Sequence, residues 1–511
     1  MFRISGLLHD DEYIGCSKHA DIAVTAIVSN TAKIRKGCVF VCICGTKHDS
    51  HADAGEAIEK GASVIVAQRP LGDDISVPVL IVPDTRRALA LMWSRSCGDP
   101  QNNLRMIAVT GTNGKTSTTF MIRSALQAAS FRVGLIGTTG CYLDGVPFHP
   151  LCEAEGDSRL TTMTTPDPDL LYPMLKEMAD AGVTHVIMEV SSHALEQMRV
   201  APITFDMALF TNLSSEHMDL HKNMKKYMLA KAKLFKQTKV GIFNADDPYA
   251  ERMASYCHGK CLFCSTSEIT DYTASDIRSL GIRGSEYTFN AKETKCLLRL
   301  QIPGRFSVSN SLLACAAACE MGVCAKDLRR GVENLRGVPG RMERITDDDS
   351  DITVMIDYAH TEAALRQILR TVRSFLDKSE RLVLVFGCGG DRDKTKRAAM
   401  GRCAEEEADF VVITSDNPRS ENPLSIIRQI ISGFTDAKKR KVIVNRRNAI
   451  AWAIENAKKH DVILLVGKGH EHYEIIGEQT IPFYEADIVR EEINRRKSRI
   501  LSEDPYDGAS E

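Results

Sequence analysis

The sequence GTNGKT, from Gly111 to Thr116, decides the fold of this chain. The apolar run LRMIAVT (104–110) precedes it and predicts a buried strand, and residues 117–130 after it have helical length with few breakers. A strand, a glycine loop and a helix in this order aim backbone N–H groups and the positive end of the helix at an anion. We therefore expect a phosphate-binding loop inside an α/β domain.

Each residue type in this loop suits phosphate chemistry. Gly111 and Gly114 allow the backbone to approach phosphate, Lys115 can reach the outer phosphates, and Thr116 can offer its hydroxyl to magnesium. The standard pattern has a further glycine where this chain has Val109, so the loop is a variant. A glycine turn without a ligand is the alternative, and the flanking strand and helix disfavour it.

Length and composition limit the class of protein. A chain of 511 residues predicts about three domains, and 65 basic against 67 acidic residues argue for small-molecule chemistry rather than a nucleic-acid surface. The sequence contains no apolar run of membrane-span length and no signal-peptide pattern, so we expect a cytoplasmic protein without membrane or nucleic-acid partners. We also expect it to be a monomer. Many of the 16 cysteines lie in apolar segments, which indicates reduced thiols.

The order of apolar runs and helical segments predicts three α/β domains. Residues 1–102 form a small N-terminal α/β domain, and the segment 97–102 (CGDPQN) is a plausible linker. Residues 103–337 form a central domain whose mostly parallel sheet has helices on both faces, with a β-rich stretch near 264–303. Residues 338–511 form a C-terminal Rossmann-like α/β domain.

Four strands of the last domain end in polar clusters. The clusters are 357–360, 387–394, 415–419 and 467–471. Ligands of parallel sheets bind at the carboxyl ends of the strands, so four such clusters predict a binding site. In the cluster 415–419, the guanidinium of Arg419 follows a proline turn and can grip a carboxylate through two hydrogen bonds.

Three side chains of the central domain suit a magnesium or manganese ion. Thr116 offers a hydroxyl, Glu189 a carboxylate at a strand end, and His217 an imidazole in LSSEHMD. Lys231, in the helical segment YMLAKAKLF, has two possible fates: a surface lysine, or a buried amine that reacts with carbon dioxide to form a metal-binding carbamate. Lys233 competes with Lys231 on spacing.

A second cluster contains Cys257, His258, Cys261 and Cys264. No second ligand pair stands at the spacing of a zinc finger, so a loop followed by the strand CLFC is the favoured interpretation.

The ordered motifs resemble one family, the Mur ligases, over nearly the whole chain. The motifs are TGTNGKT, EVSSHAL, LSSEHMD, YMLAKAKLF, GRFSVSN, PGRME, IDYAHT, GCGGDRDKTKR, SDNPR and GKGHE. The resemblance implies an ATP-dependent acid–amino-acid ligase of peptidoglycan synthesis. Such an enzyme turns the D-glutamate carboxylate of a UDP-N-acetylmuramoyl dipeptide into an acyl phosphate, which an amino-acid amine then attacks. The form DNPR is similar to that of relatives that take meso-diaminopimelate.

The resemblance also implies a role for individual residues. ATP is expected at Gly111, Thr112, Asn113, Gly114, Lys115, Thr116, Ser117, Asn310, Arg341 and Asp357. Two magnesium ions are expected at Thr116, Glu189, His217 and carbamylated Lys231, with Lys115 also catalytic. The UDP-sugar is expected at Ser29, Thr46, Lys47, His48, Thr164, Thr165, Ser191, Gln197 and Arg199. Diaminopimelate is expected at Arg392, Asp416, Asn417, Pro418, Arg419, Gly467 and Glu471.

The chain also departs from the family pattern at five positions. They are Asn30, Met163, Glu216, Ser307 and Ala398. Two alternatives to the diaminopimelate ligase remain open. One is the same scaffold with another acceptor, such as L-lysine or a folate substrate, and Arg419 disfavours lysine. The other is a non-catalytic relative that binds the nucleotide sugar.

Overall fold

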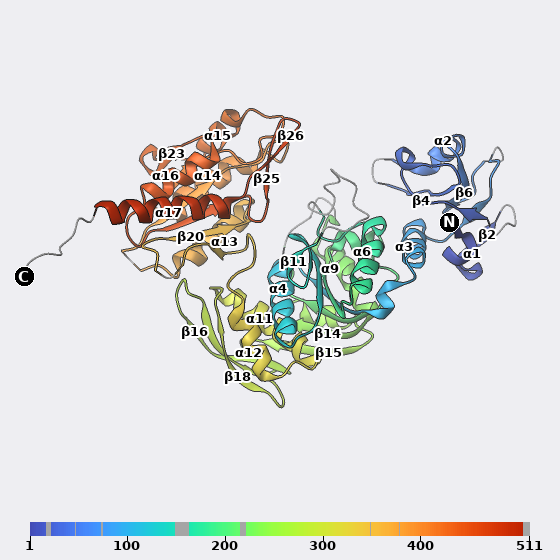
Figure 1. The fold of residues 1–511 in the computed structure, drawn as a ribbon, viewed down its shortest axis with the longest axis horizontal. Helices are drawn as coiled ribbons and strands as arrows, with labels where there is room; N and C mark the ends of the chain where they lie inside the picture. Colours follow the sequence, from blue (N-terminus) through green and yellow to red (C-terminus); the bar gives the residue numbers. More distant parts are fainter. Residues whose placement is uncertain are drawn as a thin grey trace, which may run out of the picture. The chain divides into compact units, whose positions relative to one another are not determined.

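The computed structural model describes residues 1–16, 22–45, 48–72, 75–148, 163–214, 221–347, 349–377 and 379–503. The chain divides into two compact units. Figure 1 shows its helices and strands. The first unit contains Met1–Ala274, Phe289–Cys296 and Ser309–Gly331, and the second contains Ser275–Thr288, Leu297–Val308 and Val332–Glu511. Helices long and apolar enough to cross a membrane are absent from the described part of the chain. The domain boundaries near residues 102 and 337 stay predictions.

The N-terminal domain is built on a five-stranded sheet in the order β2-β7-β6-β5-β4. Strands β4 to β7 are parallel, and β2 joins β7 antiparallel. Alternate residues of β5 and β6 face opposite cores, one with α1 and α3 and the other with α2. The elements are β1 (Phe2–Arg3), α1 (Ile4–Leu7), η1 (Asp10–Glu12), β2 (Gly15–Cys16), β3 (Ala23–Val24), β4 (Ile27–Val28), η2 (Thr31–Lys33), β5 (Cys38–Val41), η3 (Ser50–Asp53), α2 (Ala54–Glu59), β6 (Ala62–Ala67), β7 (Val79–Ile81), α3 (Thr85–Ser96) and η4 (Pro100–Asn103).

One apolar run of this domain forms two short strands rather than one. The run IAVTAIV (22–28) reads as one strand, but it forms β3 and β4 in two different sheets. The hydroxyl of Thr25 donates to the carbonyl of Lys36, and the amide of Thr25 donates to Gly37 O, so the chain turns between the two strands.

The central domain has an eleven-stranded sheet in the order β11-β10-β9-β12-β8-β13-β14-β15-β16-β17-β18. Its middle part, from β9 to β16, is parallel as expected, and β10 and β11 add an antiparallel edge. The elements are β8 (Arg105–Thr110), α4 (Lys115–Ala128), β9 (Val133–Gly137), β10 (Gly140–Leu143), β11 (Val146–Pro147), α6 (Pro168–Asp180), β12 (His185–Glu189), α7 (Ser192–Glu196), β13 (Phe205–Phe210), α9 (Met224–Ala232), η5 (Lys233–Gln237), β14 (Thr238–Asn244), α10 (Ala250–Ala254), β15 (Lys260–Ser265), β16 (Tyr272–Ser279), β17 (Ser285–Asn290), β18 (Lys295–Leu300), α11 (Arg305–Glu320) and α12 (Ala325–Asn334).

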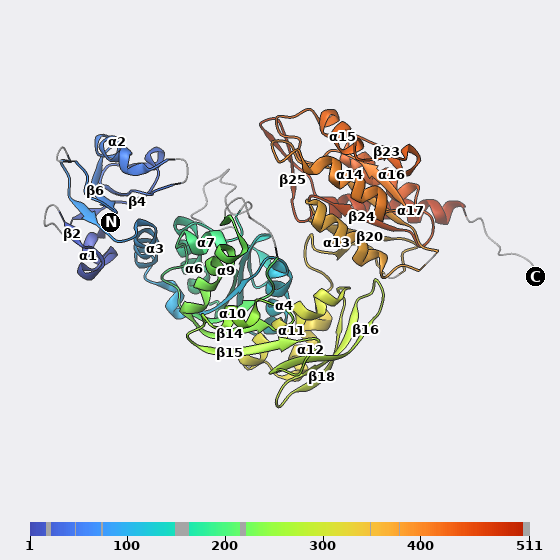
Figure 2. The same cartoon turned by 180° about the vertical axis from the view of Figure 1, so that it is seen from behind.

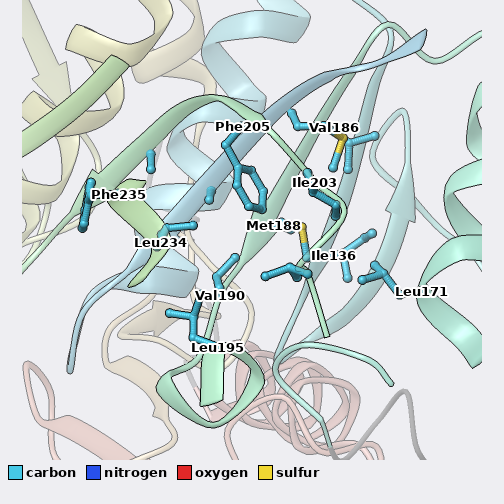
Figure 3. Close-up of a cluster of buried hydrophobic side chains, with 14 of the residues drawn as sticks. Ile136, Leu171, Val186, Met188, Val190, Leu195, Ile203, Phe205, Leu234 and Phe235 are labelled. Carbon is cyan, nitrogen blue, oxygen red and sulfur yellow. The ribbon is translucent and has the colours of Figure 1, made fainter. Parts of the chain in front are cut away.

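The apolar strands of the central sheet bury both of their faces. Figure 3 shows a cluster of buried side chains on one side of the sheet, in which Val186 and Met188 of β12 lie with Ile136 of β9 and Phe205 of β13. Helix α4 packs against β8, β9 and β12. The stretch after Cys264 is β-rich as predicted, and its strands continue the same sheet. This burial fixes the strand ends on which the candidate site is built.

The C-terminal domain has a six-stranded sheet in the order β19-β20-β24-β21-β22-β23. Strands β20 to β24 are parallel, and β19 is antiparallel. Helices α13, α14 and α15 cover one face, and α16 and α17 cover the other (Figure 2). The elements are β19 (Glu343–Arg344), β20 (Thr353–Asp357), α13 (Glu362–Arg373), β21 (Leu382–Phe386), α14 (Lys396–Glu407), β22 (Phe410–Ile413), α15 (Pro423–Ile431), η6 (Ala437–Lys439), β23 (Arg440–Val442), α16 (Arg446–Glu455), β24 (Val462–Val466), β25 (Tyr473–Ile476), β26 (Gln479–Pro482) and α17 (Glu485–Glu503).

Candidate active site

The glycine loop lies between β8 and α4, as the sequence predicts. Both glycines adopt positive φ, 148° at Gly111 and 84° at Gly114. A Cβ atom on Gly111 would lie 1.9 Å from Thr211 Oγ1, and one on Gly114 would lie 2.5 Å from Asn310 Oδ1. The loop therefore requires glycine at both positions, and it brings Asn310 of α11 against its turn.

The end of β13 holds the first half of the loop. The amide of Thr112 donates to Asn212 O at 2.8 Å, and the amide of Asn113 donates to Asn212 Oδ1 at 3.0 Å. These two N–H groups are thus used within the protein. The first turn of α4, which includes Thr116 and Ser117, carries N–H groups that have no acceptor inside a helix. We therefore expect this turn to be the part of the loop that meets an anion.

Two lysines converge on a single carbonyl of the loop. Lys115 Nζ lies 3.0 Å from Gly111 O, and Lys231 Nζ lies 2.7 Å from the same oxygen. Lys231 is only 2 % exposed and lies 4.7 Å from the ring centre of Tyr227, whereas Lys233 is exposed. The structure thus excludes the surface alternative for Lys231 and places this lysine, rather than Lys233, at the phosphate loop.

Glu189 ends β12 beside the loop, and it is fully buried. Its Oε1 accepts hydrogen bonds from Thr116 Oγ1 at 3.0 Å and from the amide of Thr138 at 2.9 Å. The hydroxyl of Thr138 donates to Oε2 at 3.1 Å. A carboxylate and hydroxyl oxygens are hard ligands, which suit magnesium.

No three His, Cys, Asp or Glu side chains form a metal cluster among the residues that the structure describes. His217 lies outside those residues. Magnesium takes most of its ligands from water and substrate phosphates and one or two from carboxylates. Thr116 and Glu189, next to a phosphate loop, therefore fit that ion.

The residues expected to bind the sugar from the central domain lie around the main chain of Glu189. Thr165 Oγ1 donates to Glu189 O at 2.8 Å and accepts from the amide of Ser191 at 3.1 Å. The guanidinium of Arg199 donates to Thr165 O and to Gln197 Oε1. Thr164 Oγ1 lies 3.1 Å from the hydroxyl of Thr138, which connects this group to Glu189.

The sugar residues expected in the N-terminal domain are only partly described. Ser29 is half-buried directly after β4. His48 Nε2 lies 2.7 Å from Asp53 Oδ2, and this hydrogen bond raises the pKa of His48. Thr46 and Lys47 lie outside the described residues.

Two residues expected at the nucleotide belong to the second unit. Arg341 lies over the ring of Tyr358, 4.9 Å from its centre. Asp357 accepts hydrogen bonds from the amides of Met342 and Ala359, both at 2.9 Å. Burial raises the pKa of Asp357, and the charge of Arg341 opposes that shift.

The four polar clusters of the C-terminal domain lie at neighbouring strand ends, because β20, β24, β21 and β22 are adjacent and parallel. The amide of Gly467 donates to Asp357 O at 3.2 Å, and a Cβ on Gly467 would lie 2.4 Å from Asp416 Oδ2. The clusters at 387–394 and 415–419 are also joined, because the amide of Gly390 donates to Asn417 O at 2.8 Å. The sequence-predicted site at this edge is therefore contiguous.

Arg419 and Glu471 provide a guanidinium and a carboxylate at this edge. Arg419 has a positive φ of 49°, and its Nη1 donates to Gly390 O at 2.9 Å. Asn417 Nδ2 donates to Glu471 Oε2 at 2.7 Å. Burial, together with the charge of Asp416, raises the pKa of Glu471. Pro418 lies between Asn417 and Arg419 in the turn, and Arg392 is exposed in the neighbouring cluster.

The structure adds site residues that the sequence reasoning missed. Thr138 holds Glu189, and Asn212, which the sequence indicates only as a polar residue at a strand end, holds the phosphate loop. The hairpin of β25 and β26 borders the DNPR turn, because the amide of Arg419 donates to Ile475 O at 3.0 Å. Lys468 lies within the motif GKGHE and is fully buried. Its place between Gly467 and Glu471 was the only sequence signal available for it.

Comparison with known proteins identifies the class to which this fold and site belong. The model of the Mur ligase middle domain matches residues 109–318, and the model of the Mur ligase glutamate ligase domain matches residues 340–469. The chain belongs to the Mur ligase family and is an ATP-dependent acid–amino-acid ligase.

Similarity extends over nearly the full length of one type of Mur ligase. The UDP-N-acetylmuramoyl-L-alanyl-D-glutamate--2,6-diaminopimelate ligase of Clostridium tetani is 39% identical over 96% of this chain and 99% of its own. That of Aquifex aeolicus is 39% identical over 92% of this chain and 93% of its own. A solved structure of a ligase with the same name has a TM-score of 0.68 at 30% identity, covering 97% of this chain and 99% of the other. The chain is thus a ligase of the type that works in peptidoglycan synthesis.

Proposed function

We propose that this ligase joins meso-diaminopimelate to the D-glutamate carboxylate of UDP-N-acetylmuramoyl-L-alanyl-D-glutamate in the cytoplasm, and that ATP is converted to ADP and phosphate. The observation that carries the acceptor is that Arg419 and Glu471 both contact the Asn417 turn at one edge of the C-terminal sheet. An amino-acid group carries one carboxylate and one ammonium, and diaminopimelate carries two such groups. A guanidinium held by a turn and a half-buried carboxylate match those charges.

Activation of the D-glutamate carboxylate takes place at the phosphate loop. A carboxylate oxygen attacks the γ-phosphorus of ATP, and the bond to ADP breaks. The N–H groups of the first turn of α4 and the ammonium of Lys115 offset the charge that develops on the transferred phosphate. Bound magnesium would supply further positive charge there, with Thr116 and Glu189 as the residues that hold it.

Lys231 is proposed to carry a carbamate. The support is its burial next to the loop, since burial favours the neutral amine that reacts with carbon dioxide. The resulting carbamate would be a second anionic group beside the phosphates, able to hold a metal ion, while His217 is proposed to complete the metal ligands.

Ligation follows when the amine of diaminopimelate attacks the acyl phosphate. The new C–N bond forms, the phosphate leaves, and the nitrogen loses a proton. Glu471 and Arg419 hold the acceptor by its charged groups, and the sugar residues around Thr165 and Arg199 are proposed to hold the nucleotide sugar. The protein thus contributes position and a preorganised field.

The test is phosphate release from ATP with the UDP-muramoyl dipeptide, comparing meso-diaminopimelate with L-lysine, and mass spectrometry of the product. Release with diaminopimelate alone supports the proposal. Release with lysine alone keeps the ligase and overturns the acceptor. Release with neither amino acid contradicts the proposed substrates.

A further inference from the structure

Lys468 is a fully buried ammonium in the loop that follows β24. Its Nζ donates to Asn417 Oδ1 at 2.9 Å and to Tyr473 O at 2.8 Å. The ring centre of Phe483 lies 5.4 Å from the same nitrogen. A buried charge is costly unless it is paired or hydrogen-bonded, so these contacts make the position of Nζ specific.

These contacts fix the orientation of the Asn417 side chain. The amide of Ile475 also donates to Asn417 Oδ1, at 3.0 Å. Lys468 and Ile475 are both donors, and an amide nitrogen cannot accept from them, so the atom that faces them is the oxygen. The nitrogen of Asn417 must then face the opposite way, where it lies 2.7 Å from Glu471 Oε2.

We infer that Lys468 is a positioning residue for the amino-acid acceptor, which acts through Asn417 to hold the carboxylate of Glu471 toward the ammonium of the acceptor. This inference rests on the proposed function, because it takes Glu471 as the group that meets the acceptor. Lys468 itself donates only into the protein at its two hydrogen bonds, so its role is indirect.

The charges around Glu471 give this role a pH signature. Burial and Asp416 raise the pKa of Glu471, whereas Lys468 and Arg419 lower it, and Asn417 lowers it through its hydrogen bond. Tyr358 and Tyr473 also lie within electrostatic range of this carboxyl. Removing the positive charge of Lys468 therefore raises the pKa of Glu471. An ionised Glu471 binds the ammonium, so the acid limb of kcat/KM for the acceptor moves to higher pH.

The experiment compares Lys468→Met with Lys459→Met, an exposed lysine of the same unit, in the full-length chain. Loss of a charge-assisted hydrogen bond to Asn417 is expected to raise KM for diaminopimelate about ten-fold or more, with KM for ATP within about two-fold of wild type. The control is expected to match wild type. An equal rise of both KM values, or an unchanged KM for diaminopimelate, would overturn the inference.

A double-mutant cycle separates positioning from general stability. In an Asn417→Ala background, Lys468→Met is expected to add less than about two-fold to KM for the acceptor, because the route to Glu471 is already broken. Full additivity of the two effects would contradict the role. If Lys468→Met does not fold, Lys468→Gln is tested instead, because glutamine keeps a hydrogen-bond donor and removes the charge. The acid limb of its pH profile of kcat/KM for the acceptor is expected to move to higher pH. An acid limb at the wild-type pH overturns the inference. A wild-type chain without acceptor-dependent phosphate release overturns the proposed function itself, and the inference with it.

Discussion

Thr116 and Glu189 are joined by a hydrogen bond of 3.0 Å between the threonine hydroxyl and Oε1 of the carboxylate. One residue belongs to the first turn of α4 and the other to the end of β12. The bond therefore ties the phosphate loop to a strand end of the central sheet. It also fixes a hydroxyl and a carboxylate oxygen beside each other, and these are the two groups proposed to hold a magnesium ion.

The first prediction concerns the charge of Glu189. Glu189→Gln keeps the shape and an acceptor for Thr116 but removes the negative charge. We expect kcat to fall by roughly 100-fold or more and the magnesium concentration for half-maximal rate to rise, because electrostatic groups at such sites contribute on this scale. A magnesium titration of phosphate release measures both. The exposed Glu251→Gln is the control, and a variant with wild-type magnesium dependence would contradict the metal role.

The second prediction concerns the buried amine of Lys231. Lys231→Ala removes the amine that lies on Gly111 O, and we expect activity to fall by roughly 100-fold or more. A small added carboxylate is expected to restore part of the rate, because it can stand in for a carbamate. Lys225→Ala, an exposed lysine of the same helix, should behave as wild type. A fully active Lys231→Ala rules out the carbamate.

The third prediction concerns acceptor recognition. Arg419→Ala removes the guanidinium beside Gly390, and KM for diaminopimelate should rise by roughly 10- to 100-fold with little change in KM for ATP. Arg419→Lys should not restore recognition, because an ammonium lacks the planar fork. Steady-state kinetics in both substrates measures the difference, with exposed Arg428→Ala as the control. An unchanged KM for diaminopimelate would contradict the role of Arg419 in binding the acceptor.

The fourth prediction is a pH dependence of stability. Arg397 makes two hydrogen bonds of 2.9 Å to the carboxylate of Glu421, and this pairing lowers the pKa of Glu421 from 4.5 to about 2. A lowered pKa contributes stability above pH 4.5, and that contribution is lost as the pH falls toward about 2. In Glu421→Gln, the free energy of unfolding should therefore decrease less steeply as the pH falls through this window. Denaturant unfolding between pH 5 and 2.5 (about half-unit steps) tests it, with exposed Glu478→Gln as the control. An identical slope of unfolding free energy against pH in Glu421→Gln and wild type would contradict this prediction.

Local sequence pattern was sufficient for most of the fold. The strand in LRMIAVT (104–110) and the helix after the glycine loop were predicted because burial and helical periodicity are visible in neighbouring residues of the sequence. The hairpin of β25 and β26 was missed because its residues are half-buried or exposed and have no long apolar run. For the site, the motifs indicated candidate residues, but the hydrogen bond of Lys468 to Asn417 is a tertiary contact that no sequence spacing encodes.

The hairpin beside the DNPR turn is bonded to it through main-chain atoms. The amide of Arg419 donates to Ile475 O, and the amide of Gly477 donates to Arg419 O at 2.8 Å. Main-chain hydrogen bonds do not depend on the identity of the neighbouring side chains. The hairpin sequence can therefore change while the shape of the turn is kept. If DNPR were placed in another ligase without a matching hairpin, the sequence of the motif would be transferred, but the shape of its turn would not.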